Sequence, residues 1–204
     1  MGSGGYETNG RGPGDAPVTI KILVVGGFGA GKTTLVGALT EIHALRTEEP
    51  VSGPGAAVDR LAGEERRSTT TVAMDFGRLT IRDNLIVYLF GAPGQERFRF
   101  MWEELASGAL GAVVLADTRR LADCFALVDF FERRRLPFAV AVNCFDGARR
   151  YHPEDVRAAL GVGPDVPVLL CDARRRPSAL DVLIALIEHA HRGLRRPRAA
   201  GTNV

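Results

Sequence analysis

Apolar residues recur along this chain in short, nearly continuous runs that alternate with amphipathic segments. Such runs are typical of strands buried on both faces of a parallel sheet, and they predict strands near 18–25, 71–82, 84–90, 111–116, 138–143 and 166–171. The segments between and after these strands fit helices near 31–45, 98–108, 121–135, 153–160 and 177–192. Strands and helices in this order predict a three-layer α/β fold with helices on both faces of a sheet.

The link between the second and third predicted strands departs from this alternation. Residues 71–82 and 84–90 are separated by too short a segment for a crossover helix. They are therefore expected to form an antiparallel pair that turns at Asp83-Asn84. The expected sheet has six strands and is mostly parallel, with one antiparallel strand.

The length of 204 residues is enough for one domain with a sizeable core. Residues 1–16 are rich in glycine and polar groups and predict a disordered N-terminal tail, and residues 194–204 predict a flexible C-terminal tail. The folded domain is expected over 17–193. Within it, residues 46–68 show little periodicity and predict a long loop.

Charge and composition narrow the classes of function. The net charge of +2 is too small to indicate nucleic-acid binding, and the run Arg174–Arg176 predicts solvated surface charge. The three cysteines have no metal-ligand spacing, so a reducing cytoplasm is the expected setting. No apolar run reaches the ~18 residues of a membrane-spanning helix, so no direct span is expected.

The strongest chemical signal is the segment GGFGAGKT, which ends at Thr33 and has the spacing G-x-x-x-x-G-K-[ST]. It follows an apolar strand and opens a helix, so its backbone N–H groups can cradle phosphate oxygens. Lys32 places a cation on the terminal phosphates, and the Thr33 hydroxyl can ligate Mg²⁺. The motif predicts a nucleoside triphosphate site and does not choose between ATP and GTP. The residues expected to bind phosphates are Gly26, Gly29, Ala30, Gly31, Lys32, Thr33 and Thr34.

Further segments resemble motifs of the Ras-superfamily small GTPases, in the order in which that family has them. Residues 90–98 (FGAPGQERF) resemble the DTAGQERF segment, and residues 71–77 (TVAMDFG) resemble the TIGVDFG switch segment of Rab-like members. Residues 143–146 (NCFD) resemble the base-reading NKxD motif, and residues 171–173 stand in place of the short SAK loop. The chain is most similar to bacterial GTPases of the gliding-motility type and, among these, to GTP-binding members of actinobacterial conservon operons.

This resemblance implies a site for GTP or GDP with Mg²⁺. Asn143 and Asp146 would read the guanine edge, because adenine has no matching pair of donors for the carboxylate. Ala173 would donate its backbone N–H to the guanine carbonyl. These three residues are thus the expected selectors of the base.

The resemblance also implies which residues sense and attack the γ-phosphate. Thr71 would close on Mg²⁺ and the γ-phosphate, with Thr70 as an alternative because the register within the threonine run is open. Gly94 would donate its N–H to the γ-phosphate. Gln95 would orient the attacking water and would act in catalysis together with Lys32. Hydrolysis would break these contacts and release both loops.

Positions 91, 144 and 28 depart from the family pattern. Gly91 stands where the family has an aspartate that supports Mg²⁺ through water, which predicts weaker metal binding. Asp75 lies on the neighbouring strand, where the usual exposure of aspartate predicts a surface position away from the metal. Cys144 replaces the lysine that packs over the base, and Phe28 replaces a glycine of the phosphate loop. We expect these changes to reduce hydrolysis more than binding.

Two functions therefore stay open. The first is a small GTPase, a switch with slow and partner-assisted hydrolysis, and the second is a GTP-binding scaffold that scarcely hydrolyses. A P-loop small-molecule kinase is a weaker third, because the GQERF and NxxD segments have no purpose in it. The resemblance implies a roadblock-type regulator and a sensor-kinase-like protein as partners, with membrane contact only through such a partner.

Overall fold

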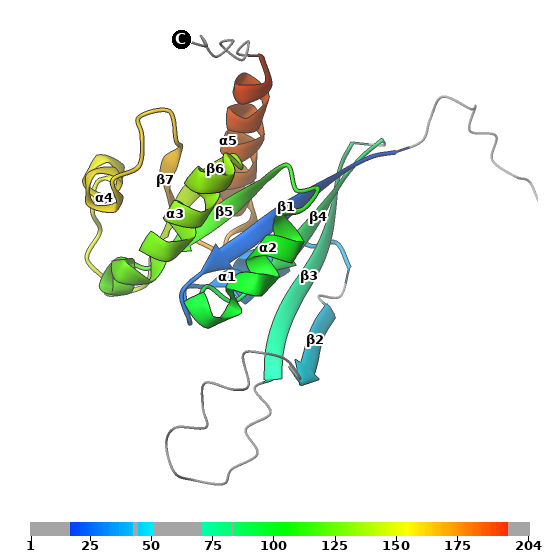
Figure 1. Ribbon diagram of the computed structural model, residues 1–204, viewed down its shortest axis with the longest axis horizontal. Coiled ribbons are helices and arrows are strands. Elements are labelled where there is room, and N and C mark those ends of the chain that lie inside the picture. Colours follow the sequence, from blue (N-terminus) through cyan, green and yellow to red (C-terminus); the bar gives the residue numbers. More distant parts are fainter. Residues whose placement is uncertain (1–16, 43–44, 51–70, 83, 196–204) are drawn as a thin grey trace, which may run out of the picture.

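A sheet of seven strands forms the centre of the computed structural model, which describes residues 17–42, 45–50, 71–82 and 84–195 (Figure 1). The strands are β1 (Val18–Gly26), β2 (Leu45–Pro50), β3 (Thr71–Arg82), β4 (Leu85–Gly91), β5 (Gly111–Ala116), β6 (Phe138–Asn143) and β7 (Val168–Cys171). Their order in space is β2-β3-β4-β1-β5-β6-β7. Only β3 runs against its neighbours, since the pairs that do not include it are parallel. The predicted mostly parallel α/β fold with one antiparallel strand is confirmed.

Helices cover both faces of the sheet. They are α1 (Lys32–Leu39), α2 (Arg99–Ala106), α3 (Phe125–Arg134), α4 (Pro153–Leu160) and α5 (Arg176–Arg195). In Figure 1, α2 and α3 lie in front of the sheet and α5 lies behind it. One core cluster buries Trp102 of α2 and Phe131 of α3, and a separate cluster buries Leu35 of α1 and Leu183 of α5. The helices on the two faces, with the sheet between them, make the three predicted layers.

The predicted boundaries differ most between β1 and β3. The helix predicted over 31–45 ends at Leu39, where Thr40 adopts an extended conformation with φ −67° and ψ 146°. The Thr40 hydroxyl donates to the carbonyl oxygen of Arg78 at 3.3 Å and accepts from its N–H at 3.1 Å, which ties the chain to β3. Residues 45–50 then form β2, a seventh strand beside the six predicted. The remainder of the predicted loop, 51–68, lies outside the described residues.

Other boundaries shift by a few residues. The helix predicted over 121–135 begins as a 3-10 segment, Thr118–Cys124, and becomes α-helical at Phe125. The predicted tail 1–16 lies outside the described residues, and so does the tail 194–204 apart from the last two residues of α5. Among the described helices, none combines the length and the apolar character that crossing a membrane requires.

The sequence motifs lie at the carboxyl ends of the parallel strands, along one edge of the sheet. Gly26 ends β1, Gly91 ends β4, Asn143 ends β6 and Cys171 ends β7. Ligands of open α/β sheets bind in the crevice outside these strand ends. The fold therefore places the phosphate loop, the GQERF segment and the NCFD segment around one common site.

Candidate functional site

The turn between β1 and α1 depends on glycine at two positions. Gly29 and Gly31 have φ values of 74° and 103°, in the left-handed region that side chains rarely adopt. A Cβ atom at Gly31 would lie 2.5 Å from the side-chain nitrogen of Asn143, so the loop passes close to the end of β6. α1 begins directly after Gly31, which provides no side-chain cap. The first N–H groups of the helix are therefore available to an anion.

The ammonium group of Lys32 folds back over this loop. Its Nζ donates to the carbonyl oxygens of Gly26 and Gly27, each at 2.9 Å. Burial lowers the pKa of Lys32, and the nearby carboxylates of Asp75 and Asp123 oppose that shift. A phosphate at this place would meet a partly desolvated cation and would itself favour the charged form of the lysine.

Thr33, the residue expected to ligate Mg²⁺, contacts a buried carboxylate. Its Oγ1 donates to Oδ2 of Asp75 at 2.7 Å, and Asp75 is only 6% exposed. The expected surface position of Asp75 is therefore wrong. It fails because Asp75 lies opposite Gly91 on β4, and the glycine leaves the space beside it to the carboxylate.

The segment after β4 packs directly on the phosphate loop. A Cβ atom at Gly94 would overlap the carbonyl oxygen of Gly26 and would lie 3.0 Å from the nitrogen of Gly27. Trp102 of α2 holds the same segment, because its fully buried indole donates to the carbonyl oxygen of Pro93 at 2.7 Å. Gly94 thus lies against the loop, where the resemblance to small GTPases puts a γ-phosphate contact.

The other residues expected at the phosphates are less directly placed. Gln95 is half-buried, and its Oε1 accepts from Nε of Arg97 at 3.0 Å. Thr34 is exposed near the start of α1, and the N–H of Ala30 bonds within the loop. Thr71 begins β3, but its side chain lies outside the described part of the chain, as does all of Thr70.

Asn143 is buried and connects two loops of the site. Its Nδ2 donates to the carbonyl oxygen of Ala30 at 2.9 Å, and its Oδ1 accepts from the N–H of Ala173 at 3.2 Å. The amide thus joins the phosphate loop to the turn after β7. In this structure the N–H of Ala173, expected to meet the guanine carbonyl, is bonded to Asn143.

Asp146 is exposed and has a partner that the sequence does not single out. The guanidinium of Arg174 donates through Nη1 and Nη2 to both carboxylate oxygens of Asp146, and it also bonds to Asp172. These hydrogen bonds hold the pKa of Asp146 below its usual range. Arg174 is exposed, as predicted for surface charge, yet it is engaged with the residue expected to read the base. In the sequence, the one indication of this contact is that Arg174 directly follows Ala173, a residue expected at the base.

The residues around Thr33 fit a bound Mg²⁺. Within the described ranges, no three histidine, cysteine or acidic side chains gather as a metal-binding group. At nucleotide sites, however, Mg²⁺ takes its ligands mainly from phosphates and water, with one or two protein oxygens. The Thr33 hydroxyl and the buried Asp75 carboxylate are two such oxygen groups, 2.7 Å apart beside the phosphate loop.

Comparison with known sequences finds a family and one relative. Residues 24–193 match the model of a family described as conserved hypothetical ATP binding protein. The uncharacterized protein MJ1339 of Methanocaldococcus jannaschii is 30% identical over 129 residues, which are 62% of this chain and 71% of the relative.

Solved structures with a similar fold include G domains, some of them with GDP bound. The G domain of the T. maritima FeoB iron transporter superposes with a TM-score of 0.58 and 17% identity, over 85% of this chain and 99% of that domain. The cytosolic domain of the same transporter in a GDP form gives 0.60 and 18%, over 85% of this chain and 64% of that one. A GDP-bound mutant of S. thermophilus NFeoB gives 0.56 and 17%, over 83% and 62%. This chain is thus a member of the family described as conserved hypothetical ATP binding protein, with the fold of a P-loop G domain.

Proposed function

We propose that this protein binds GTP and GDP with Mg²⁺ and acts as a molecular switch with slow, partner-assisted hydrolysis. The observation that carries nucleotide binding is the ammonium of Lys32, held over the Gly26 and Gly27 carbonyl oxygens where α1 begins. A cation, a tight turn of backbone and a helix N-terminus converge there. Each of these groups stabilises phosphate charge, and together they are typical of polyphosphate sites.

The choice of guanine rests on the carboxylate of Asp146. Its two oxygens accept a fork of two N–H donors from Arg174. Guanine presents a similar fork, made of its ring N–H and its exocyclic amine, whereas adenine would leave one oxygen unpaired. The family's description names ATP, so the identity of the bound base is the first property to measure.

In the proposed reaction the oxygen of a water molecule bonds to the γ-phosphorus of GTP. The bond between the γ-phosphorus and the oxygen that bridges it to the β-phosphate breaks, and that oxygen stays with GDP. The γ-phosphate leaves as inorganic phosphate, which takes up the protons of the water. Lys32 and the loop N–H groups would stabilise the charge on the phosphate oxygens. Gly94 would donate to the γ-phosphate, and Gln95 would orient the water after its Oε1 leaves Arg97. A bound Mg²⁺ would neutralise charge on the β- and γ-phosphates.

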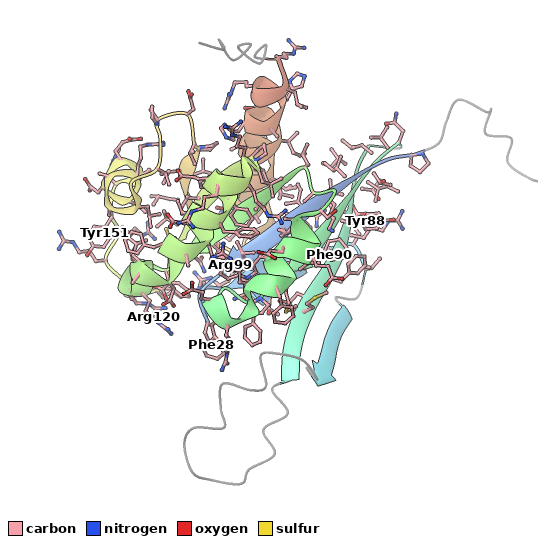
Figure 2. All side chains as sticks on the ribbon, viewed as in Figure 1. Phe28, Tyr88, Phe90, Arg99, Arg120 and Tyr151 are labelled. Carbon is pink, nitrogen blue, oxygen red and sulfur yellow. The ribbon has the colours of Figure 1, made fainter. Side chains whose placement is uncertain are left out.

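A GTP-binding scaffold with very little hydrolysis is the second candidate. The side-chain oxygen of Gln95, which would orient the attacking water, is bonded to Arg97 in this structure. Phe28 is 74% exposed at the tip of the turn after β1 (Figure 2), where an arginine from a partner would approach the nucleotide. Both observations favour binding over turnover.

The proposed setting follows from the resemblance to conservon and gliding-motility GTPases. A roadblock-type regulator and a sensor-kinase-like protein are the proposed partners, in the cytoplasm and with recruitment to the membrane through a partner. Co-purification of the chain with these two proteins, expressed together, tests this part independently of hydrolysis.

Nucleotide released from the purified protein by denaturation, and identified by chromatography, tests the base. We expect GDP or GTP, and release of adenine nucleotides alone would contradict the guanine assignment. Incubation with GTP, followed by chromatography of the products, then separates the two candidates. Formation of GDP supports the slow GTPase, and retention of intact bound GTP supports the scaffold.

A further inference from the structure

The ends of β3 and β4 share one space beside the phosphate loop. Asp75 on β3 lies directly opposite Gly91, the last residue of β4. Side chains directly opposite each other in an antiparallel pair point to the same face, with Cβ atoms about 4.5–5.5 Å apart. A side chain at position 91 would therefore compete with Asp75 for the same place.

The space left by Gly91 is already filled by Asp75. A Cβ atom at Gly91 would lie 2.9 Å from Cβ of Asp75 and 3.1 Å from its Oδ2. Real Cβ atoms do not approach other atoms at 2.9 Å, so one of the two groups would have to move. The Asp75 side chain can therefore keep its present position only while residue 91 is a glycine.

The Asp75 carboxylate is directed at the hydroxyl of Thr33. Asp75 is 6% exposed, and its Oδ2 accepts the Thr33 hydroxyl proton at 2.7 Å. A buried carboxylate is costly unless it is hydrogen-bonded or paired, so its burial at this place requires such partners. While the Thr33 proton is donated to Asp75, the oxygen lone pairs of Thr33 are directed elsewhere and can face a cation.

We infer that Asp75 is the positioning carboxylate of the Mg²⁺ site, supplied from β3 in the place that Gly91 leaves open on β4. It orients the Thr33 hydroxyl as a metal ligand and adds a negative charge beside the cation. This role rests on the nucleotide binding proposed above. Carboxylates that orient a ligand in this way commonly change metal affinity by about 10- to 100-fold when removed.

The test is the Mg²⁺ dependence of nucleotide release from the full chain. Dissociation of fluorescent mant-GDP is followed over a series of Mg²⁺ concentrations and with EDTA. In Asp75→Asn we expect the Mg²⁺ concentration for half-maximal slowing to rise about 10- to 100-fold, with little change of the rate in EDTA. The matched control is Asp123→Asn, which removes another carboxylate near Lys32 that does not bond to Thr33.

Two further variants separate this role from general damage to the fold. Gly91→Ala keeps the carboxylate but displaces it, so we expect a weaker Mg²⁺ effect in the same direction. The double variant Asp75→Gly with Gly91→Asp moves the carboxylate from β3 to β4. It should recover much of the Mg²⁺ effect, and this non-additivity would show that the two positions serve one site.

Each outcome decides between the proposals. An unchanged Mg²⁺ dependence in Asp75→Asn and Gly91→Ala, in proteins that still bind mant-GDP, would overturn the role of Asp75 and leave guanine-nucleotide binding intact. If Asp75→Asn does not fold, Gly91→Ala decides alone. A wild-type protein that does not bind mant-GDP would overturn the proposed function itself.

Discussion

The phosphate end of the candidate site is held by partly buried contacts, whereas Asp146, the carboxylate of its base end, is held by exposed ion pairs. Lys32 bonds to two loop carbonyl oxygens, and Thr33 bonds to the buried Asp75. Among the described residues, Asp146 is bonded on the surface by the exposed Arg174. Exposed ion pairs contribute little free energy and exchange easily, while buried charge-assisted bonds keep their geometry. We therefore expect most of the affinity for the nucleotide to come from the phosphate end. Selectivity for the base is expected to come from Asp146, after its carboxylate exchanges Arg174 for the base.

The largest effect is expected from Lys32→Ala. It removes the cation at the phosphates and should weaken mant-GDP binding by about 3 kcal/mol, on the order of 100-fold, because hydrogen bonds to a half-buried charge are lost. Lys21→Ala is the matched control, since Lys21 is the other lysine and its ammonium group lies over the ring of Phe90 and donates to the carbonyl oxygen of Ser107. Equal affinities of Lys32→Ala and wild type in a fluorescence titration would contradict the phosphate-end assignment.

Asp146→Asn should have the next largest effect, and it tests the base end alone. An amide cannot accept both donors of guanine, so GDP affinity should fall on the order of 30-fold. Xanthine nucleotides offer a carbonyl in place of the amine, and their affinity should rise. Competition titrations against mant-GDP measure both changes. If the ratio of the affinities for GDP and XDP were the same in this variant as in wild type, Asp146 would not be a residue that reads the base.

Trp102→Phe tests how firmly the segment after β4 is anchored. It leaves the Pro93 carbonyl oxygen without its indole donor inside the protein. The free energy of unfolding should fall by about 1–3 kcal/mol, and the melting temperature by roughly 2–4 °C per kcal/mol for a domain of this size. Circular dichroism melting measures this, with the exposed Phe125→Leu as control. A melting temperature equal to that of wild type would show that the bond does not anchor the segment.

The smallest expected effect is a gain of affinity in Arg174→Ala. The guanidinium occupies the carboxylate that the base would use, so its removal should strengthen mant-GDP binding roughly two- to fivefold at low salt. The gain should shrink at high salt, because salt screens exposed ion pairs. Arg175→Ala is the control, as an exposed neighbour of the same charge. Weaker binding in Arg174→Ala would mean that this arginine supports the base and does not compete with it.

The local pattern of the sequence predicted the parts of the site that lie within one short segment. The spacing of GGFGAGKT between an apolar strand and a helix predicts the turn, and the structure confirms that Lys32 opens α1 after it. The apolar runs likewise predict β1, β5 and β6, because a strand buried on both faces needs no distant information to be recognised.

The tertiary structure decided what depends on contacts between distant segments. β2 forms only by pairing with β3, and α1 stops where Thr40 meets Arg78. The position of Asp75 follows from its register against Gly91, which no local pattern encodes. The bond between Arg174 and Asp146 joins two turns that meet only at the carboxyl edge of the sheet.

The sequence by itself therefore determined the fold class and the phosphate loop, since both arise from short-range periodicity and from the conformational freedom of glycine. Which carboxylate faces Thr33, and which partner holds Asp146, were decided only when the strands paired. The physical reason is that a side chain's neighbours across a sheet depend on strand register, and register is set by the packing of the whole domain.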